Sequence, residues 1–181
     1  MVMVHLALNQ QRLPAIILIT GALMMIGSGP RAQPPSLSLP INCTPGTDCW
    51  LVNLVDHDPN TGFRDFRCTD HGYNGHKGTD IAIRDLSAMR AGVPVLAAAP
   101  GVVTALRDGM MDRVPSAEFQ RTKRNLFCGN GVVVRHADGW ETQYCHLRQG
   151  SVVVKRGQRL DRGQQIGLVG HSGMATFPHI H

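Results

Sequence analysis

Two short segments place metal-binding side chains at close spacing. His76 and Asp80 lie four residues apart in His76-Lys-Gly-Thr-Asp80, and the chain ends on His179-Ile180-His181. In a strand, residues i and i+2 point the same way, so both imidazoles of the second segment can face one site. Imidazole and carboxylate donors suit zinc with a fourth position left open for water, which is the arrangement of a catalytic site.

The first pair needs a bent backbone. Gly72, Gly75 and Gly78 disfavour a helix there, and residues 81–83, Ile-Ala-Ile, predict a strand that begins near Asp80. Four residues of straight strand would hold the two Cα atoms about 13 Å apart, which is too far for ligands of one ion. We therefore expect a bend at Gly78. By itself the pair is weak evidence, because His and Asp at this spacing are commonly solvated turn residues.

The rest of the chain predicts an all-β fold, an antiparallel sheet or sandwich with a metal-binding groove. From residue 93 onward, short β-prone segments alternate with glycine-containing turns. In order, these segments are VPVLAAA, GVVTAL, GVVVRHA, WETQYCHL, SVVVKRG and QQIGLVGHSG. A polar stretch at 108–127 interrupts them and predicts a loop over one face. One predicted strand ends in Tyr-Cys-His146-Leu and so brings a further histidine to the sheet.

The N-terminus predicts export. Arg12 precedes an uncharged apolar stretch at 13–27, which is too short to span a bilayer comfortably. We predict a signal peptide at 1–32. The alternative is that this segment is retained as an anchor, and only then would the chain contact a membrane. A linker at 33–42, a loop-rich lead-in at 43–67 and a domain at 68–181 follow, and we expect a monomer.

The charge balance is mildly basic. The 18 Lys and Arg against 13 Asp and Glu give +5, and removal of residues 1–32 with their two arginines leaves +3. This balance suits an anionic polymer such as a cell wall, and no basic run indicates nucleic acid.

Five cysteines without Cys-x-x-Cys spacing favour disulfides over a thiolate metal site in an exported chain. We expect a Cys128–Cys145 bond across a hairpin whose register requires either a bulge or an offset, which Gly129 and Gly131 can provide. Of the other three cysteines, Cys43 and Cys49 are separated by a turn and are favoured as the second pair, which leaves Cys68 without a partner.

Three segments, HKGTD, YCHL and HIH, together and in this order resemble the signature elements of the lysostaphin-type zinc endopeptidases, which cut peptide bonds in bacterial peptidoglycan. GNGVVVRH and GQQIGLVGHSG are similar to the strand and turn pattern of that family. The resemblance covers about residues 68–181 and implies that this region is the peptidase domain. It also implies stem or bridge peptides of peptidoglycan as substrate and the periplasm or cell envelope as location.

The resemblance implies a role for each of five residues. His76, Asp80 and His181 match the zinc ligands, whereas His146 and His179 match two histidines that do not bind the metal and lie beside its water. Zinc lowers the pKa of that water, and an unligated histidine can accept its proton or hold the developing oxyanion. The chain has no Glu of the His-Glu-x-x-His kind, so histidine must act as the base. The expected cofactor is therefore zinc.

The sequence departs from this family at its end. Family members continue past the final motif with a strand and a closing segment, whereas this chain stops at His181. We therefore expect that the peptidase domain is truncated and that one or more C-terminal strands are missing.

Two other functions stay open. One is a non-catalytic module of the same fold that binds the cell wall or activates a hydrolase, although the complete set of five residues argues against it. The other is a biotinyl or lipoyl carrier domain, whose Ala-Pro-Gly-Val-Val and Gly-Gln turns are similar. A carrier needs a modifiable lysine at a hairpin tip, and none appears. For the enzyme, the cleaved bond can be a stem-to-stem cross-link or a glycine bridge.

Overall fold

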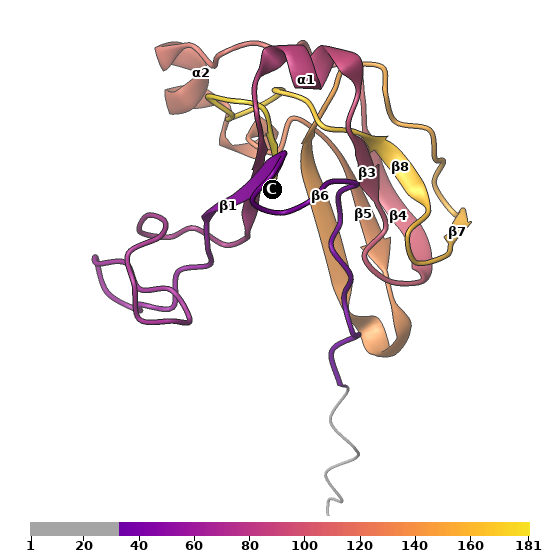
Figure 1. Ribbon diagram of the computed structural model, residues 1–181, viewed down its shortest axis with the longest axis horizontal. Helices are drawn as coiled ribbons and strands as arrows, with labels where there is room; N and C mark the ends of the chain where they lie inside the picture. The colour runs from indigo at the N-terminus through magenta and orange to yellow at the C-terminus, as the bar shows by residue number, and fades with distance from the viewer. Residues whose placement is uncertain (1–32) are drawn as a thin grey trace, which may run out of the picture. The chain divides into compact units, whose positions relative to one another are not determined.

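The computed structural model describes residues 33–181, so the signal peptide predicted at 1–32 lies outside the described residues. This part of the chain consists mainly of short antiparallel strands (Figure 1), which confirms the predicted fold class. Among the described residues, no helix has the length and apolar character needed to cross a membrane.

The strands form three sheets. The largest has the order β6-β5-β4-β7 and contains β4 (Gly101–Arg107), β5 (Asn130–Arg135), β6 (Glu141–Leu147) and β7 (Arg159–Leu160). A three-stranded sheet has the order β1-β2-β9 and contains β1 (Cys49–Asn53), β2 (Asp80–Ile83) and β9 (His179–Ile180). A third sheet pairs β3 (Pro94–Leu96) with β8 (Gln165–Leu168).

The three-stranded sheet packs one face on the apolar core and turns the other face away from it. Ile81, Ile83 and Ile180 are buried in the core, and residues on a strand alternate between its two faces. Asp80 and His179 therefore lie on the opposite face, because each alternates with one of these isoleucines. Strand β1, from the predicted lead-in, pairs with β2 and widens this second face.

The hairpin of β5 and β6 follows the prediction closely. A 3₁₀ turn at Ala137–Gly139 joins the two strands, and their register shifts between Asn130 and Val132, next to the expected glycines. Cys128 and Cys145 form a disulfide, and so do Cys43 and Cys49. Both expected disulfides are thus confirmed, and Cys68 is exposed and unpaired.

Three segments differ from the sequence prediction. Helix α1 (Leu86–Ala91) was not predicted, although Asp85 caps it by accepting the Ala88 N–H and Gly92 ends it with a φ of 96°. Helix α2 (Ala117–Thr122) and a 3₁₀ turn at Arg124–Leu126 lie inside the stretch predicted as loop. The segment 151–157, predicted as a strand, is not one, and β7 begins only at Arg159.

Acidic side chains order the loop between β1 and β2. Asp56 accepts the N–H groups of Asp58 and Arg64, a pattern typical of Asp in turns. Asp65 is buried and is hydrogen-bonded to the Thr69 hydroxyl. Burial would raise the pKa of Asp65, but the hydrogen bonds outweigh it and lower that pKa to about 2. These hydrogen bonds hold the conformation of the loop that leads to His76.

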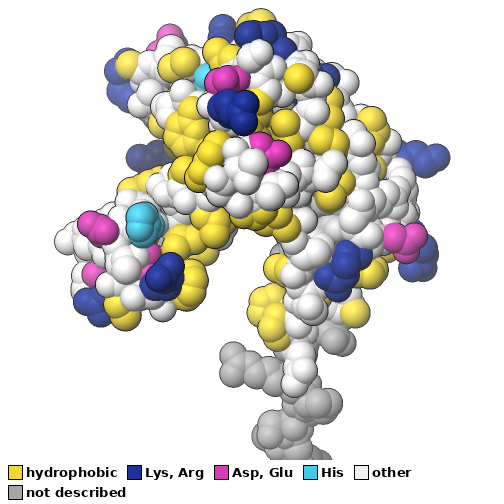
Figure 2. All heavy atoms as spheres, viewed as in Figure 1, with side chains coloured by type: hydrophobic (Ala, Val, Ile, Leu, Met, Phe, Trp, Pro, Cys, Tyr) yellow, Lys and Arg dark blue, Asp and Glu magenta, His cyan; other side chains and the backbone are white. Residues whose placement is uncertain are grey.

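Charged and apolar side chains alternate over the surface. Figure 2 shows one face, on which Lys and Arg side chains are spread apart and hydrophobic side chains are exposed between them. Several large apolar side chains are more than a third exposed, among them Trp50 at 40% and Phe177 at 37%. Both line one groove together with Ala82 of β2.

Candidate metal centre

Three predicted ligands converge at one point. The Nε2 of His76 lies 3.2 Å from Asp80 Oδ1 and 3.1 Å from the Nδ1 of His181. The Nδ1 of His181 lies 2.7 Å from the same carboxylate oxygen, across 101 residues of sequence. His76 comes from the loop before β2, Asp80 from the first position of β2, and His181 from the residue after β9. Segments far apart in sequence thus supply one compact donor set.

Gly78 makes this convergence possible. The chain bends there, between His76 and Asp80, as the spacing of the pair predicts. A Cβ atom at this position would lie 2.6 Å from the imidazole of His181. The glycine is therefore needed for the close approach of the third donor in addition to the bend.

Neighbouring polar groups orient two of the donors. The Nδ1 of His76 lies 2.8 Å from the Leu54 carbonyl oxygen, to which it donates, so its Nε2 carries the lone pair. Asn53 donates to Asp80 Oδ2 over 2.8 Å and leaves Oδ1 facing the imidazoles. Burial would raise the pKa of Asp80, but hydrogen bonds from His181 and Asn53 outweigh it and lower that pKa to about 2.

This donor set fits a first-row divalent metal. Ligand atoms about 2 Å from a tetrahedral ion lie about 3.3 Å from one another, close to the separations between these three atoms. Two nitrogens and one carboxylate oxygen match the ligand chemistry of zinc. In a second group of metal-type donors, formed by Cys43, Asp48 and Cys49, the two cysteine sulfurs are joined in a disulfide.

His146 and His179 lie beside the donor set. Their ring centroids are 4.6 Å apart, and the Nε2 of His179 lies 3.8 Å from Asp80 Oδ1. The Nδ1 of His146 donates to the Ser172 carbonyl oxygen and the Nδ1 of His179 to that of Phe177, each over 2.8 Å. In both rings, the unprotonated nitrogen is therefore Nε2.

Both imidazoles are neutral near pH 7. Burial, together with the neighbouring His179, lowers the pKa of His146 to about 3. Burial also lowers the pKa of His179. Each neutral ring therefore presents a free Nε2 lone pair that can accept a hydrogen bond or a proton.

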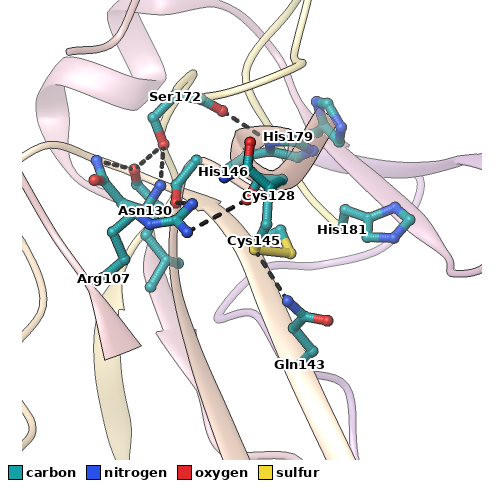
Figure 3. Close-up of a disulfide and its surroundings, with 12 residues drawn as sticks. Arg107, Cys128, Asn130, Gln143, Cys145, His146, Ser172, His179 and His181 are labelled. Carbon is teal, nitrogen blue, oxygen red and sulfur yellow. Dashed lines mark hydrogen bonds between the residues drawn. A yellow bond between two sulfur atoms is a disulfide. The ribbon is translucent and has the colours of Figure 1, made fainter. Parts of the chain in front are cut away.

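The backbone of His146 adopts an unusual conformation. Its φ is +62°, in the left-handed region that residues other than glycine seldom occupy. Figure 3 shows the disulfide of the preceding residue, Cys145, beside this histidine. The His146 N–H also donates to the Cys128 carbonyl oxygen over 2.8 Å. The disulfide and this hydrogen bond tie the strained residue and its neighbour to the same partner.

The structure adds supporting residues that the motifs did not reveal. Asn53 and the Leu54 carbonyl lie in the lead-in, far in sequence from the donors that they orient. Ser172 orients His146, and its own hydroxyl accepts the Asn130 N–H and donates to the Leu147 carbonyl (Figure 3). In the sequence, Asn130 and Ser172 lie in the family-like segments GNGVVVRH and GQQIGLVGHSG, whereas Asn53 and Leu54 lie in no such segment.

Comparisons with known proteins cover the same region. The sequence model described as Peptidase family M23 matches residues 74–181. The peptidoglycan DD-endopeptidase ShyA of Vibrio cholerae is 36% identical over 106 residues, which cover 59% of this chain and 19% of ShyA. The DD-carboxypeptidase/endopeptidase Mpg of Neisseria meningitidis is 36% identical over 111 residues, which cover 61% of this chain and 20% of Mpg.

A solved structure shares the fold. A chain of the SpoIIQ–SpoIIIAH pore-forming complex matches with a TM-score of 0.52 at 19% sequence identity, covering 80% of this chain and 81% of that one. At this identity the likeness shows the fold alone. The chain spans about a fifth of the length of the two curated relatives above, at 19% and 20%.

Proposed function

The chain belongs to peptidase family M23, and we propose from this premise that it is an exported, zinc-dependent endopeptidase that hydrolyses peptide cross-links of bacterial peptidoglycan. The names of the relatives support the substrate, because ShyA is a peptidoglycan DD-endopeptidase and Mpg a DD-carboxypeptidase/endopeptidase. The observation that carries the proposal is the convergence of His76, Asp80 and His181 next to two further histidines with free Nε2 atoms.

In this proposal, His76, Asp80 and His181 hold the ion. Zinc bound there supplies a Lewis acid and lowers the pKa of a bound water toward neutrality. The hydrogen bonds from His76 to the Leu54 carbonyl and from Asn53 to Asp80 fix the orientation of two ligands before the metal arrives.

His146 and His179 perform the proton transfers. Each can accept a proton at Nε2, because Nδ1 is already committed to a carbonyl oxygen. Once protonated, the same Nε2–H can donate to a developing oxyanion or to the leaving amine. The carbonyls of Ser172 and Phe177 stabilise the positive charge that the rings then carry.

The two disulfides support export, because such bonds persist in oxidising compartments such as the periplasm. We propose that the peptidase domain spans 68–181, after a signal peptide at 1–32, a linker at 33–42 and a lead-in at 43–67. The location would be the periplasm or cell envelope, where peptidoglycan lies, and the protein would act as a monomer.

The test is a digest of purified peptidoglycan sacculi with the full chain, followed by mass spectrometry of the released muropeptides. We expect cross-linked dimers to become monomers, chelation to stop the reaction and added zinc to restore it. Intact cross-links after incubation with zinc-loaded protein would contradict the proposal. That outcome would favour the non-catalytic wall-binding or hydrolase-activating module instead.

A further inference from the structure

His171 carries an unused nitrogen. Its side chain is buried, with only 5% of the residue exposed. Its Nε2 is the single side-chain nitrogen or oxygen in the described part of the chain that is both fully enclosed and without a hydrogen-bond partner. Buried polar atoms in folded proteins are nearly always paired, so an unpaired one requires a reason. A ligand that supplies the missing partner is such a reason.

The histidine lines an apolar groove that adjoins the proposed reaction centre. The groove has a volume of about 890 Å³, and Trp50, Ala82 and Phe177 form part of its wall. Ala82 pairs with His179 across the sheet, and the Phe177 ring lies 4.6 Å from the His179 ring. Gly170 also pairs with His179, which places the next residue, His171, at the same edge.

The charged side chains of the groove favour an anion. Arg84 and Arg90 line it, and Asp85 is the single acid among the residues that do so. The Asp85 carboxylate is already occupied, because its Oδ1 accepts the Ala88 N–H at the start of α1. Asp112 is not among the residues that line the groove, and its carboxylate accepts the backbone N–H of His171 over 2.7 Å.

We propose that His171 and Arg84 form a subsite for a carboxylate of the peptide substrate, next to the bond that is cut. This inference rests on the proposed function and narrows its substrate class. When the substrate fills the groove, the Nε2–H of His171, which is enclosed in this structure, becomes the donor to the carboxylate. Arg84 balances the charge of that carboxylate, and the apolar wall accepts a short aliphatic side chain. The substrate is then a cross-link with a free carboxylate beside the cleaved amide, as opposed to a glycine bridge, which has no charge there.

Two matched peptides test the subsite. Both end in D-alanyl-D-alanine, one as the free carboxylate and one as the carboxamide. Binding is measured by calorimetry on the full zinc-loaded chain carrying His146→Ala, in which loss of the proposed base prevents turnover. We expect the carboxylate to bind about tenfold or more tightly than the amide, the range for a hydrogen bond to a charged group. Equal binding of both peptides, or binding of neither, overturns the subsite.

Substitutions assign the preference to residues. His171→Leu, made in the same background, should reduce the preference to within about twofold, whereas His171→Gln, which keeps an N–H near the Nε2 position, should retain most of it. Arg84→Gln changes an exposed side chain and should also lower the preference, and Arg156→Gln, on the turn before β7, should leave it unchanged. If Arg84→Gln and His171→Leu both keep the full preference, the assignment is wrong.

The proposed function is tested separately, by cleavage of sacculi with the unsubstituted protein, which retains His146. Cleavage without discrimination between the two peptides would reject the carboxylate subsite and leave the peptidase proposal standing. Discrimination between the peptides without cleavage of sacculi would reject the peptidase and keep the subsite.

Discussion

The two ends of β6 hold two buried polar clusters that differ in what their nitrogens do. The closed cluster, at the start of β6, consists of His136, Thr142 and Tyr144. Its imidazole uses both nitrogens, with Nδ1 2.8 Å from the Pro100 carbonyl oxygen and Nε2 2.8 Å from the Thr142 hydroxyl. The Tyr144 hydroxyl is hydrogen-bonded to the Thr142 hydroxyl over 3.0 Å and accepts the Ala98 N–H. Every ring nitrogen and hydroxyl in this cluster has a partner.

The open cluster lies at the other end of β6 and consists of His76, Asp80, His146, His179 and His181. Here three metal-type donor atoms lie within hydrogen-bonding distance of one another, and two more rings keep a free Nε2. His136 and His146 are equally buried, at 6% exposure each, so burial does not separate the clusters. What separates the two clusters is therefore whether the imidazole nitrogens have hydrogen-bond partners. Unpaired nitrogens indicate a candidate site, whereas fully paired ones indicate structural polar packing.

Removing the carboxylate of the open cluster should have the largest effect. Asp80→Ala leaves two of the three proposed ligands, so we expect zinc to fall from about one ion per chain to near zero and peptidoglycan cleavage to be lost with it. The measurement is metal analysis of the dialysed protein by mass spectrometry.

Asp108→Ala is the matched control for this substitution. The Asp108 carboxylate also receives backbone hydrogen bonds, from Gly150 and Val152, but it lies outside the open cluster. Metal content should stay near one ion per chain. Full occupancy in the Asp80 variant would show that the ligand set is wrong.

Substitution of the two free histidines should separate metal binding from catalysis. We expect His146→Ala and His179→Ala to keep zinc and to lose hydrolysis by about a hundredfold or more, the range for loss of a general base. Zinc content and muropeptide release are measured on the same preparation. If a variant retains both zinc and hydrolysis, the substituted histidine takes no part in the mechanism. If a variant loses zinc, the substituted histidine is a metal ligand.

Much of the open cluster could be predicted from short-range rules. The period-2 alternation of a strand places His179 and His181 on one face, and the glycines before Asp80 predict the bend that returns His76 to it. The hairpin bulge and the Cys128–Cys145 bond also follow from counting residues across one turn. These features depend on residues that are close in sequence, so the sequence pattern alone predicts them.

Other features depend on contacts that no local pattern encodes. Asn53 reaches Asp80 only because β1 pairs with β2, and the Ser172 carbonyl reaches His146 across 26 residues. Helices α1 and α2 are six residues each, too short for a clear apolar period, so their capping residues were the single available signal. The closed cluster was equally hidden, because a buried and fully paired His136 has no sequence signature.

Removal of the Cys128–Cys145 disulfide tests whether the hairpin holds the open cluster in shape. The double variant Cys128→Ala, Cys145→Ala should lose about 2–4 kcal/mol of unfolding free energy. It should also lower kcat about tenfold. Without the disulfide, the strained backbone of His146 can relax and move its imidazole out of place. A rise of about 1.4 kcal/mol in the activation free energy corresponds to a tenfold lower rate. Denaturant unfolding and a rate on soluble muropeptides measure the two effects.

The other disulfide provides the comparison. Cys43→Ala with Cys49→Ala also removes a covalent bond, but this bond closes a turn before β1 and touches none of the five residues of the open cluster. We expect a loss of stability and an unchanged kcat for the folded protein. Equal losses of kcat in the two double variants would mean that the hairpin bond has no specific role in positioning His146.

The smallest effect on activity is expected from the closed cluster. Tyr144→Phe removes the hydroxyl that accepts the buried Ala98 N–H over 2.8 Å and leaves that donor without a partner. Such a loss costs about 1–3 kcal/mol of unfolding free energy. Since the hydroxyl points to the Ala98 backbone and away from the metal donors, zinc content and kcat should stay at the values of the unsubstituted protein. A fall in kcat with full zinc occupancy and native stability would instead place Tyr144 on the substrate and break the distinction between the two ends of β6.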